Sequence, residues 1–113
     1  MRTVLFDGRE YRGPYIPGGA ELPAVRAYAL VCVEGGEGLK VLTFLHSDDI
    51  AAEVANSKWR DCWEKNRNRF HIQVYVLETD DGPEARDAFK REFLDRRLRT
   101  MPCDELPPIE DDF

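Results

Sequence analysis

The chain has 113 residues, of which 42% are hydrophobic and 34% are charged, and its formal net charge at pH 7 is −6. A chain of this length supports one modest hydrophobic core, and it contains no apolar run near the roughly 20 residues that a membrane helix requires. Its first residues, MRTVLFDGRE, lack the pattern of a secretion signal. We therefore expect a single domain in the cytoplasm (the host cytoplasm if a phage encodes it), with no membrane partner.

The first part of the chain predicts irregular structure followed by a β-hairpin. Residues 1–23 are rich in glycine and proline, so we expect at most short extended pieces there. Residues 25–34, VRAYALVCVE, have the β-branched and aromatic members of a largely buried strand, and residues 39–46, LKVLTFLH, form a second strand pattern. The turn sequence GGEG between them favours a hairpin.

A helix, a strand and another helix are predicted to follow. Ser47 or Asp48 can cap a helix that we expect to run to about residue 64, because apolar residues recur there at helical spacing. Residues 70–78, FHIQVYVLE, are the strongest strand pattern in the chain. Pro83 suits the first turn of a last helix, which we expect to end near residue 99.

This order of hairpin, helix, strand and helix predicts an α+β fold with a small, mainly antiparallel sheet. We expect one domain over residues 1–103 and a disordered acidic tail over residues 104–113. The tail, DELPPIEDDF, holds five of the 22 acids and none of the 16 bases, so the remainder of the chain is near neutral. Residues 58–71 and 86–99 are basic, which indicates a basic binding surface in addition to the acidic tail.

The densest group of candidate functional residues is SKWRDCWEKNRNRFHI, residues 57–72, in which cations are interleaved with aromatic rings. Single-stranded nucleic acid requires both, cations along the phosphates and flat rings on which bases stack. A second interpretation stays open, in which the tryptophans pack in the core and the cations are only solvated. The candidate nucleic-acid-binding residues are Lys58, Trp59, Arg60, Trp63, Lys65, Arg67, Arg69 and Phe70.

The second basic segment, residues 86–99, is predicted to be the exposed face of the last helix. Three acid–base pairs in it have the favourable i,i+4 order, so most of its charge supports the helix itself. Lys90 and Arg97 have no such partner along the helix. We therefore add these two residues to the candidate phosphate contacts.

Candidate catalytic groups are sparse. The two histidines, His46 and His71, stand at strand ends without ligand-like spacing to acids or cysteines, and the sequence has no phosphate-binding glycine loop. The three cysteines, Cys32, Cys62 and Cys103, are widely spaced, so we expect reduced thiols rather than a disulfide. The sequence thus predicts a non-enzymatic protein without catalytic residues, metal or cofactor.

The element order of residues 25–102 resembles the core of the GIY-YIG nucleases. Tyr28 in AYALV falls where that family has its first tyrosine, and Glu92 in AFKREFL falls near its metal-binding glutamate. The positions of the second tyrosine, the motif glycine and the helix arginine hold Leu42, Phe44 and Glu53. Since that arginine stabilises charge during phosphodiester cleavage, the resemblance implies a nucleic-acid-handling scaffold that has lost catalysis.

The end of the tail, IEDDF, resembles the acidic tip of the single-stranded DNA-binding proteins of bacteria and phages. In that family the terminal phenylalanine enters an apolar pocket on replication, repair or transcription proteins, and basic residues around the pocket meet the acids. The resemblance implies that Phe113 is the anchor of a partner-binding tip and that Glu110, Asp111 and Asp112 are its electrostatic contacts. Capture of a C-terminal carboxylate is a known recognition mode.

These patterns favour a non-enzymatic protein that binds single-stranded DNA and recruits replication or transcription proteins through its tail. We expect it to oligomerise, because one domain of this size offers only a short footprint. A second hypothesis is a protein-interaction adapter, or an inhibitor of a host nucleic-acid enzyme, that does not bind DNA; the near-neutral body favours it. The third, a GIY-YIG-like nuclease, is opposed by the missing arginine.

Overall fold

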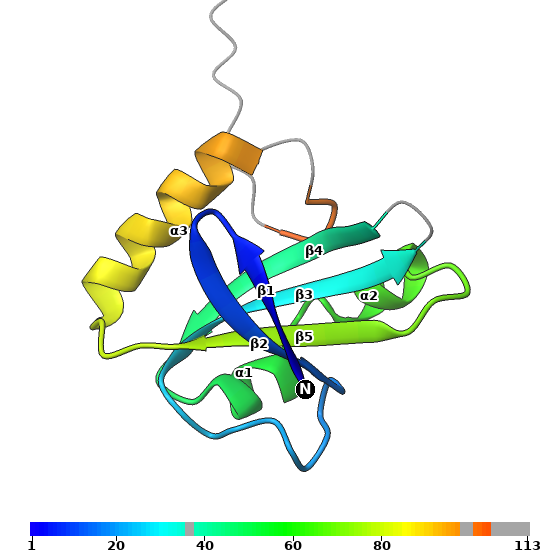
Figure 1. Ribbon diagram of the computed structural model, residues 1–113, viewed down its shortest axis with the longest axis horizontal. Helices are drawn as coiled ribbons and strands as arrows, with labels where there is room; N and C mark the ends of the chain where they lie inside the picture. Colours follow the sequence, from blue (N-terminus) through cyan, green and yellow to red (C-terminus); the bar gives the residue numbers. More distant parts are fainter. Residues whose placement is uncertain (36–37, 98–100, 105–113) are drawn as a thin grey trace, which may run out of the picture.

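The sheet is built around the two apolar runs that predict a hairpin. The computed structural model describes residues 1–35, 38–97 and 101–104. Its strands are β1 (Arg2–Phe6), β2 (Arg9–Tyr15), β3 (Ala27–Gly35), β4 (Gly38–Ser47) and β5 (Ile72–Glu78). β3 lies between β4 and β5, and the order across the sheet is β1-β2-β5-β3-β4, with every neighbouring pair antiparallel (Figure 1). The predicted α+β class with a mainly antiparallel sheet is confirmed.

Helices cover both faces of the sheet. Successive side chains of β3 point to opposite faces, so its apolar residues need cover on both sides. Ala29 is buried in the cluster that also contains Val54 and Trp63 from the first two helices, whereas Tyr28 is buried in the cluster that contains Phe93 from the third. These helices are α1 (Ile50–Ala55), α2 (Arg60–Asn66) and α3 (Pro83–Arg97). No helix in the described part of the chain is long and apolar enough to cross a membrane.

Residues 1–23, expected to hold only short extended pieces, contain the hairpin of β1 and β2. Asp7 and Gly8 form its turn, with φ angles of 49° and 78°. The hairpin extends the sheet because β2 pairs with β5. It curls over the face that α3 covers, so that the ring centroids of Phe6 and Phe93 lie 5.3 Å apart (Figure 1).

The pairing of β2 with β5 requires a glycine at position 13. Tyr11 and Gly13 are buried while their neighbours in β2 are exposed, which is the alternation of a strand with one face on a core. At Gly13 the two strands approach so closely that a Cβ atom would lie 2.6 Å from the carbonyl oxygen of Val74. Only a residue without a side chain fits this approach.

The region predicted as one helix, from residue 48 to about residue 64, forms the two short helices α1 and α2. Val54 and Trp63 belong to the same buried cluster. In a continuous helix these two residues would be about two and a half turns apart and would point in opposite directions. The chain therefore breaks between them, where the Trp59 backbone N–H donates to Ser57 Oγ at 3.1 Å before α2 begins.

The edge of the sheet at β4 is covered by residues 101–104. The Cys103 backbone N–H donates to the carbonyl oxygen of Leu42 at 3.0 Å. The Phe44 backbone N–H donates to Asp104 Oδ2 at 2.7 Å. The segment thus uses one main-chain and one side-chain group to satisfy polar atoms at this edge.

Asp104, expected to begin the disordered tail, is held in the body of the protein. Its side chain is buried and forms an ion pair with Lys90 Nζ at 3.1 Å, in addition to accepting the hydrogen bond from β4. A buried carboxylate requires such partners. The expectation that Asp104 lies in a disordered tail is therefore wrong, and the other residues of the predicted tail, 105–113, lie outside the described residues.

Cys62 and Cys103 form a disulfide, so the expectation of three reduced thiols is wrong. The two cysteines are 41 residues apart in sequence, but α2 packs beside the C-terminal segment and brings their Cα atoms to 5.7 Å. Sequence spacing carries no information about this proximity. Cys32 is a free thiol, and burial raises its pKa to about 12.

We expect Gly13→Ala to destabilise the protein by about 1–3 kcal/mol, because the new Cβ would collide with backbone of β5 that cannot move away without disturbing the sheet. Thermal unfolding followed by circular dichroism measures the change. Gly82→Ala is the matched control, because a Cβ at Gly82 meets no atom within 4 Å. A Gly13→Ala variant as stable as this control would contradict the close approach of β2 to β5.

Candidate functional site

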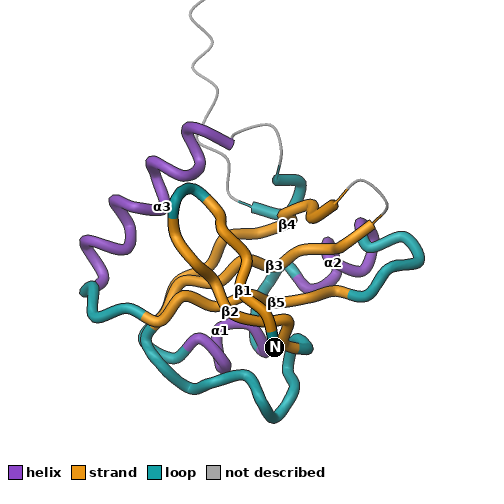
Figure 2. The backbone as a smooth tube through the Cα atoms, viewed as in Figure 1, coloured by secondary structure: helices purple, strands orange, loops and turns teal. Residues whose placement is uncertain are grey.

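A groove of about 860 Å³ lies between α2 and the end of β2. One wall is residues 14–17, at the end of β2 and in the long loop that leads to β3 (Figure 2). The second wall is α2, and residues 71–73 at the start of β5 complete the lining. The first wall offers apolar surface, since Ile16 is 75% exposed. We call this hollow the α2 groove.

Trp63 contributes to the lining of the α2 groove and is part of the core. Its side chain is 1% exposed, and its Nε1–H donates to Thr43 Oγ1 on β4 at 2.7 Å. A buried indole needs such an acceptor. Of the two roles that the sequence leaves open for this tryptophan, the structure places it in the core, where its ring has no free face for a base.

The charged side chains on the groove are of both signs. The cations are Arg60, the first residue of α2, and Arg67, its C-cap residue, and the imidazole of His71 lies just before β5. Arg60 Nη1 donates to the last carbonyl of α1 at 2.6 Å, and Arg67 Nε pairs with Glu64 Oε2 at 2.7 Å. Asp61 is a further exposed acid on the groove. An anionic ligand would therefore have to compete with Glu64 for Arg67.

The other cations of the predicted cluster, Lys58, Lys65 and Arg69, are exposed but do not line the groove. Lys58 Nζ lies 5.2 Å from the centroid of the Trp59 ring. Trp59 is half-buried against the core, and Phe70 is 38% exposed. These two rings, unlike Trp63, keep accessible surface on which a base can stack.

Of the remaining predicted site residues, the structure describes only the side chain of Lys90, which does not line the α2 groove. Lys90 lies on α3, whose core residues belong to the opposite face of the sheet, and its ammonium group pairs with Asp104. Lys90 thus has an acidic partner, which comes from the C-terminal segment and not from its own helix. The Arg97 side chain and the tip residues Glu110, Asp111, Asp112 and Phe113 lie outside the described residues.

Residues 14–17 and 71–73 complete the groove although they are not among the candidates that the sequence predicts. The run GPYIPGG is typical of a loop, and residues 71–73 resemble an ordinary strand start. The pairing of β2 with β5 brings the two segments together. Because this pairing joins residues about sixty positions apart, no local sequence pattern predicts it.

A second cluster of titratable groups fixes the start of α3 to the end of β4. Arg86, 3% exposed, donates to Asp48 Oδ1 at 3.0 Å, to the Asp81 carbonyl at 2.7 Å and to His46 Nδ1 at 3.3 Å. His46 Nε2 lies 3.2 Å from Asp87 Oδ1. Since the guanidinium is buried and engaged on several sides, we interpret this cluster as a structural network.

The positions that resemble those of the GIY-YIG nucleases do not converge. Tyr28 is buried and donates its hydroxyl hydrogen to Asp81 Oδ2 at 2.9 Å, and burial helps raise its pKa to about 12. Glu53 on α1 and Glu92 on α3 are exposed, on helices whose core residues lie on opposite faces of the sheet. Among the described residues, no three histidine, cysteine or acidic side chains gather in a way that could hold a metal.

Comparison with known proteins adds no relative from which a role could be transferred. No family model matches the chain, and no match is found among curated proteins or solved structures. The role of the α2 groove therefore has to be argued from its own residues.

We expect the stability of the protein to depend on pH through His46. Burial lowers the pKa of His46 below its ordinary value of 6.5, Lys90 and Arg86 act in the same direction, and Asp87 opposes them. The unfolded chain then binds the proton more readily than the folded protein. The contribution to the free energy of unfolding is therefore complete above about pH 6.5 and is lost as the pH falls below that value.

The measurement is the change in Tm between about pH 7.5 and pH 5. His46→Gln should show a smaller fall in Tm than the wild-type protein. His71→Gln, which removes an exposed histidine, should keep the wild-type fall. The same pH dependence in His46→Gln and wild type would contradict the role given to His46.

Proposed function

We propose that this protein binds single-stranded DNA along the α2 groove and does not act as an enzyme. The observation that carries the proposal is the meeting of Arg60, Arg67 and His71 with the apolar wall of residues 14–17 in one groove. Single-stranded DNA presents a regular line of phosphates together with bases that have apolar faces. A groove with cations on one side and apolar surface on the other can hold both.

The exposed residues next to the groove extend this surface. Lys65 is in the last turn of α2, and Arg69 and Phe70 lie in the turn between α2 and β5. Phosphates that leave the groove along this turn would meet Lys65 and Arg69, and a base could stack on Phe70. A footprint of this size holds few nucleotides, so a homo-oligomer would lengthen it.

The acidic tip is proposed to recruit other proteins. Phe113 would enter an apolar pocket on a replication or transcription protein, and Glu110, Asp111 and Asp112 would meet basic residues around it. The support for this is the resemblance of IEDDF to the tips of single-stranded DNA-binding proteins. The same acids could also compete with DNA phosphates for the cations of the groove.

One observation favours a second candidate function, that of an adapter or inhibitor that binds a protein instead of DNA. Asp61 and Glu64 lie on the groove, and Glu64 already pairs with Arg67. Apolar surface with both signs of charge also suits a peptide. In this function the protein would dock on a host nucleic-acid enzyme without contacting DNA.

We expect Arg60→Gln and Arg67→Gln each to weaken binding of fluorescein-labelled oligo-dT and to reduce its dependence on salt. Removing one cation that neutralises a phosphate should lower the slope of log K against log [salt] by about 0.7, and the double variant should lower it by about 1.4. Fluorescence anisotropy at several salt concentrations gives these slopes. Arg91→Gln, which removes one exposed charge from α3, is the matched control and should leave the slope unchanged.

Two results of this experiment would reject DNA binding at the groove. One is an unmodified protein that binds neither oligo-dT nor duplex DNA in low salt. The other is an equal fall in affinity in Arg60→Gln and the Arg91→Gln control. Capture of a partner from nuclease-treated lysate by a protein that does not bind oligo-dT would select the adapter function.

We expect removal of residues 105–113 to tighten binding to oligo-dT at low salt, because the deletion removes four acids that compete with phosphates for the groove. The truncation keeps Asp104, because Asp104 is buried against β4 and Lys90. The advantage should shrink as salt is raised, since screening weakens the competing charges. Equal affinities of the full and shortened chains at low salt would exclude this competition.

A further inference from the structure

The disulfide lies on the helix that forms one wall of the α2 groove. Cys62 is within α2, between Arg60 and Trp63, and Cys103 belongs to the segment that covers β4. Cys62 is half-buried, whereas Cys103 is completely buried. A thiol in solution can therefore approach the sulfur of Cys62 more easily than that of Cys103.

Few other interactions hold α2 in place. The helix has seven residues, and its N-cap residue, Trp59, makes no side-chain capping hydrogen bond. Trp63 is its one fully buried residue. A helix this short is not stable by itself in water and depends on tertiary contacts. The side chain of Trp63 and the disulfide are therefore its main anchors.

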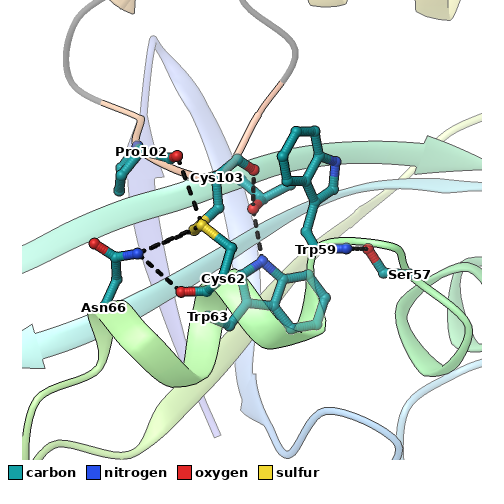
Figure 3. The surroundings of a disulfide bond; sticks show 8 residues. Ser57, Trp59, Cys62, Trp63, Asn66, Pro102 and Cys103 are labelled. Atoms are coloured by element: carbon teal, nitrogen blue, oxygen red, sulfur yellow. Dashed lines mark hydrogen bonds between the residues drawn. A yellow bond between two sulfur atoms is a disulfide. The ribbon is translucent and has the colours of Figure 1, made fainter.

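The two anchors are connected to each other. Trp63 Nε1 donates to Thr43 Oγ1, and the Thr43 hydroxyl donates to the carbonyl oxygen of Cys103 (Figure 3). Asn66, one turn after Cys62, points its amide at the disulfide: Nδ2 lies 3.4 Å from Cys62 Sγ and 3.5 Å from Cys103 Sγ (Figure 3). Hydrogen bonds thus connect the surroundings of the disulfide with Trp63, which lines the groove.

We propose that the Cys62–Cys103 disulfide is a thiol-exchange site whose reduction by a dithiol loosens α2 and weakens ligand binding in the α2 groove. This inference rests on the proposed function for the identity of the ligand, but not for the effect on α2. In the oxidised protein the disulfide holds Arg60 and Arg67 in position along the groove. In the reduced protein the side chain of Trp63 is the main anchor that remains.

The exchange follows ordinary thiol–disulfide chemistry. A thiolate of the dithiol attacks Cys62 Sγ, the sulfur–sulfur bond breaks, and Cys103 leaves as a thiolate toward which the Asn66 amide can donate a hydrogen bond. The second thiolate of the dithiol then attacks the first sulfur of the dithiol, which is bonded to Cys62 Sγ in the mixed disulfide. Cys62 leaves as a thiolate. The dithiol loses two electrons and becomes a cyclic disulfide, and the two cysteines gain those electrons and two protons.

The structure separates this effect from general unfolding. The segment around Cys103 is also held by the hydrogen bond to Leu42 and by the interactions of Asp104 with Phe44 and Lys90. These interactions do not involve either sulfur. Reduction should therefore release α2 while β3, β4 and β5 stay paired.

The test compares oxidised protein with protein in dithiothreitol, using two independent measurements. Affinity for fluorescein-labelled oligo-dT should fall about five- to tenfold on reduction, within the range of ordinary coupling between two sites. Amide hydrogen exchange should become faster in residues 60–66 and stay unchanged in β3 and β5. A Cys62→Ala/Cys103→Ala variant should behave like reduced protein and ignore dithiothreitol, whereas Cys32→Ala should keep the response.

The two measurements distinguish failure of this inference from failure of the proposed function. If oxidised protein does not bind oligo-dT but exchange in residues 60–66 rises on reduction, DNA binding is rejected and the control of α2 stands. If exchange in residues 60–66 is unchanged on reduction, this inference is overturned whatever the DNA result. Should the double variant fail to fold, the reductant response of the wild-type protein decides by the same readouts.

The proposed hydrogen bond from Asn66 to the departing Cys103 thiolate can be tested by the rate of reduction. Asn66→Leu keeps a side chain of similar size but removes the amide that faces both sulfurs. It should lower the rate constant for reduction by dithiothreitol, because the departing Cys103 thiolate loses a hydrogen-bond donor. An unchanged or higher rate would overturn this part of the mechanism.

Discussion

The hydrogen bond from the Trp63 indole to the Thr43 hydroxyl joins the parts of the structure on which the candidate site depends. It connects α2 to β4, and the same hydroxyl passes the connection to the main chain of Cys103. A buried indole N–H without an acceptor would cost the desolvation of that group, so the position of α2 is coupled to that of β4. Because α2 has no other fully buried side chain, the wall of the groove is placed by this hydrogen bond and by the disulfide.

The two faces of the sheet are held together by different kinds of interaction. On the face of α3, aromatic rings pack closely, and the Arg86 network and the Lys90–Asp104 pair fix charged groups in place. On the face of α1 and α2, the helices are short and the α2 groove lies between one of them and the sheet. The face of α3 is tightly packed and holds the sheet in place. The face of α1 and α2 carries the groove in which a ligand could bind.

The sequence predicted those elements whose signal is local. β3, β4 and β5 are continuous apolar runs, and α3 begins at a proline suited to that position, so each is recognisable alone. β2 is not recognisable from its own residues, because Tyr11 and Gly13 are buried only through the pairing of β2 with β5. The break between α1 and α2 depends on where Trp63 must point. The cation-rich cluster could likewise be found from its residues, whereas the opposite wall of the groove and the disulfide depend on long-range packing.

The cover over β4 has a consequence for how copies of this protein can associate. An uncovered edge strand presents main-chain donors and acceptors to any other extended chain, and this is a common origin of fibrils and of swapped dimers. Here the backbone groups of Leu42 and Phe44 are already occupied by Cys103 and Asp104. A second copy therefore cannot continue the sheet at these positions of β4, whereas β1 forms the opposite edge of the sheet.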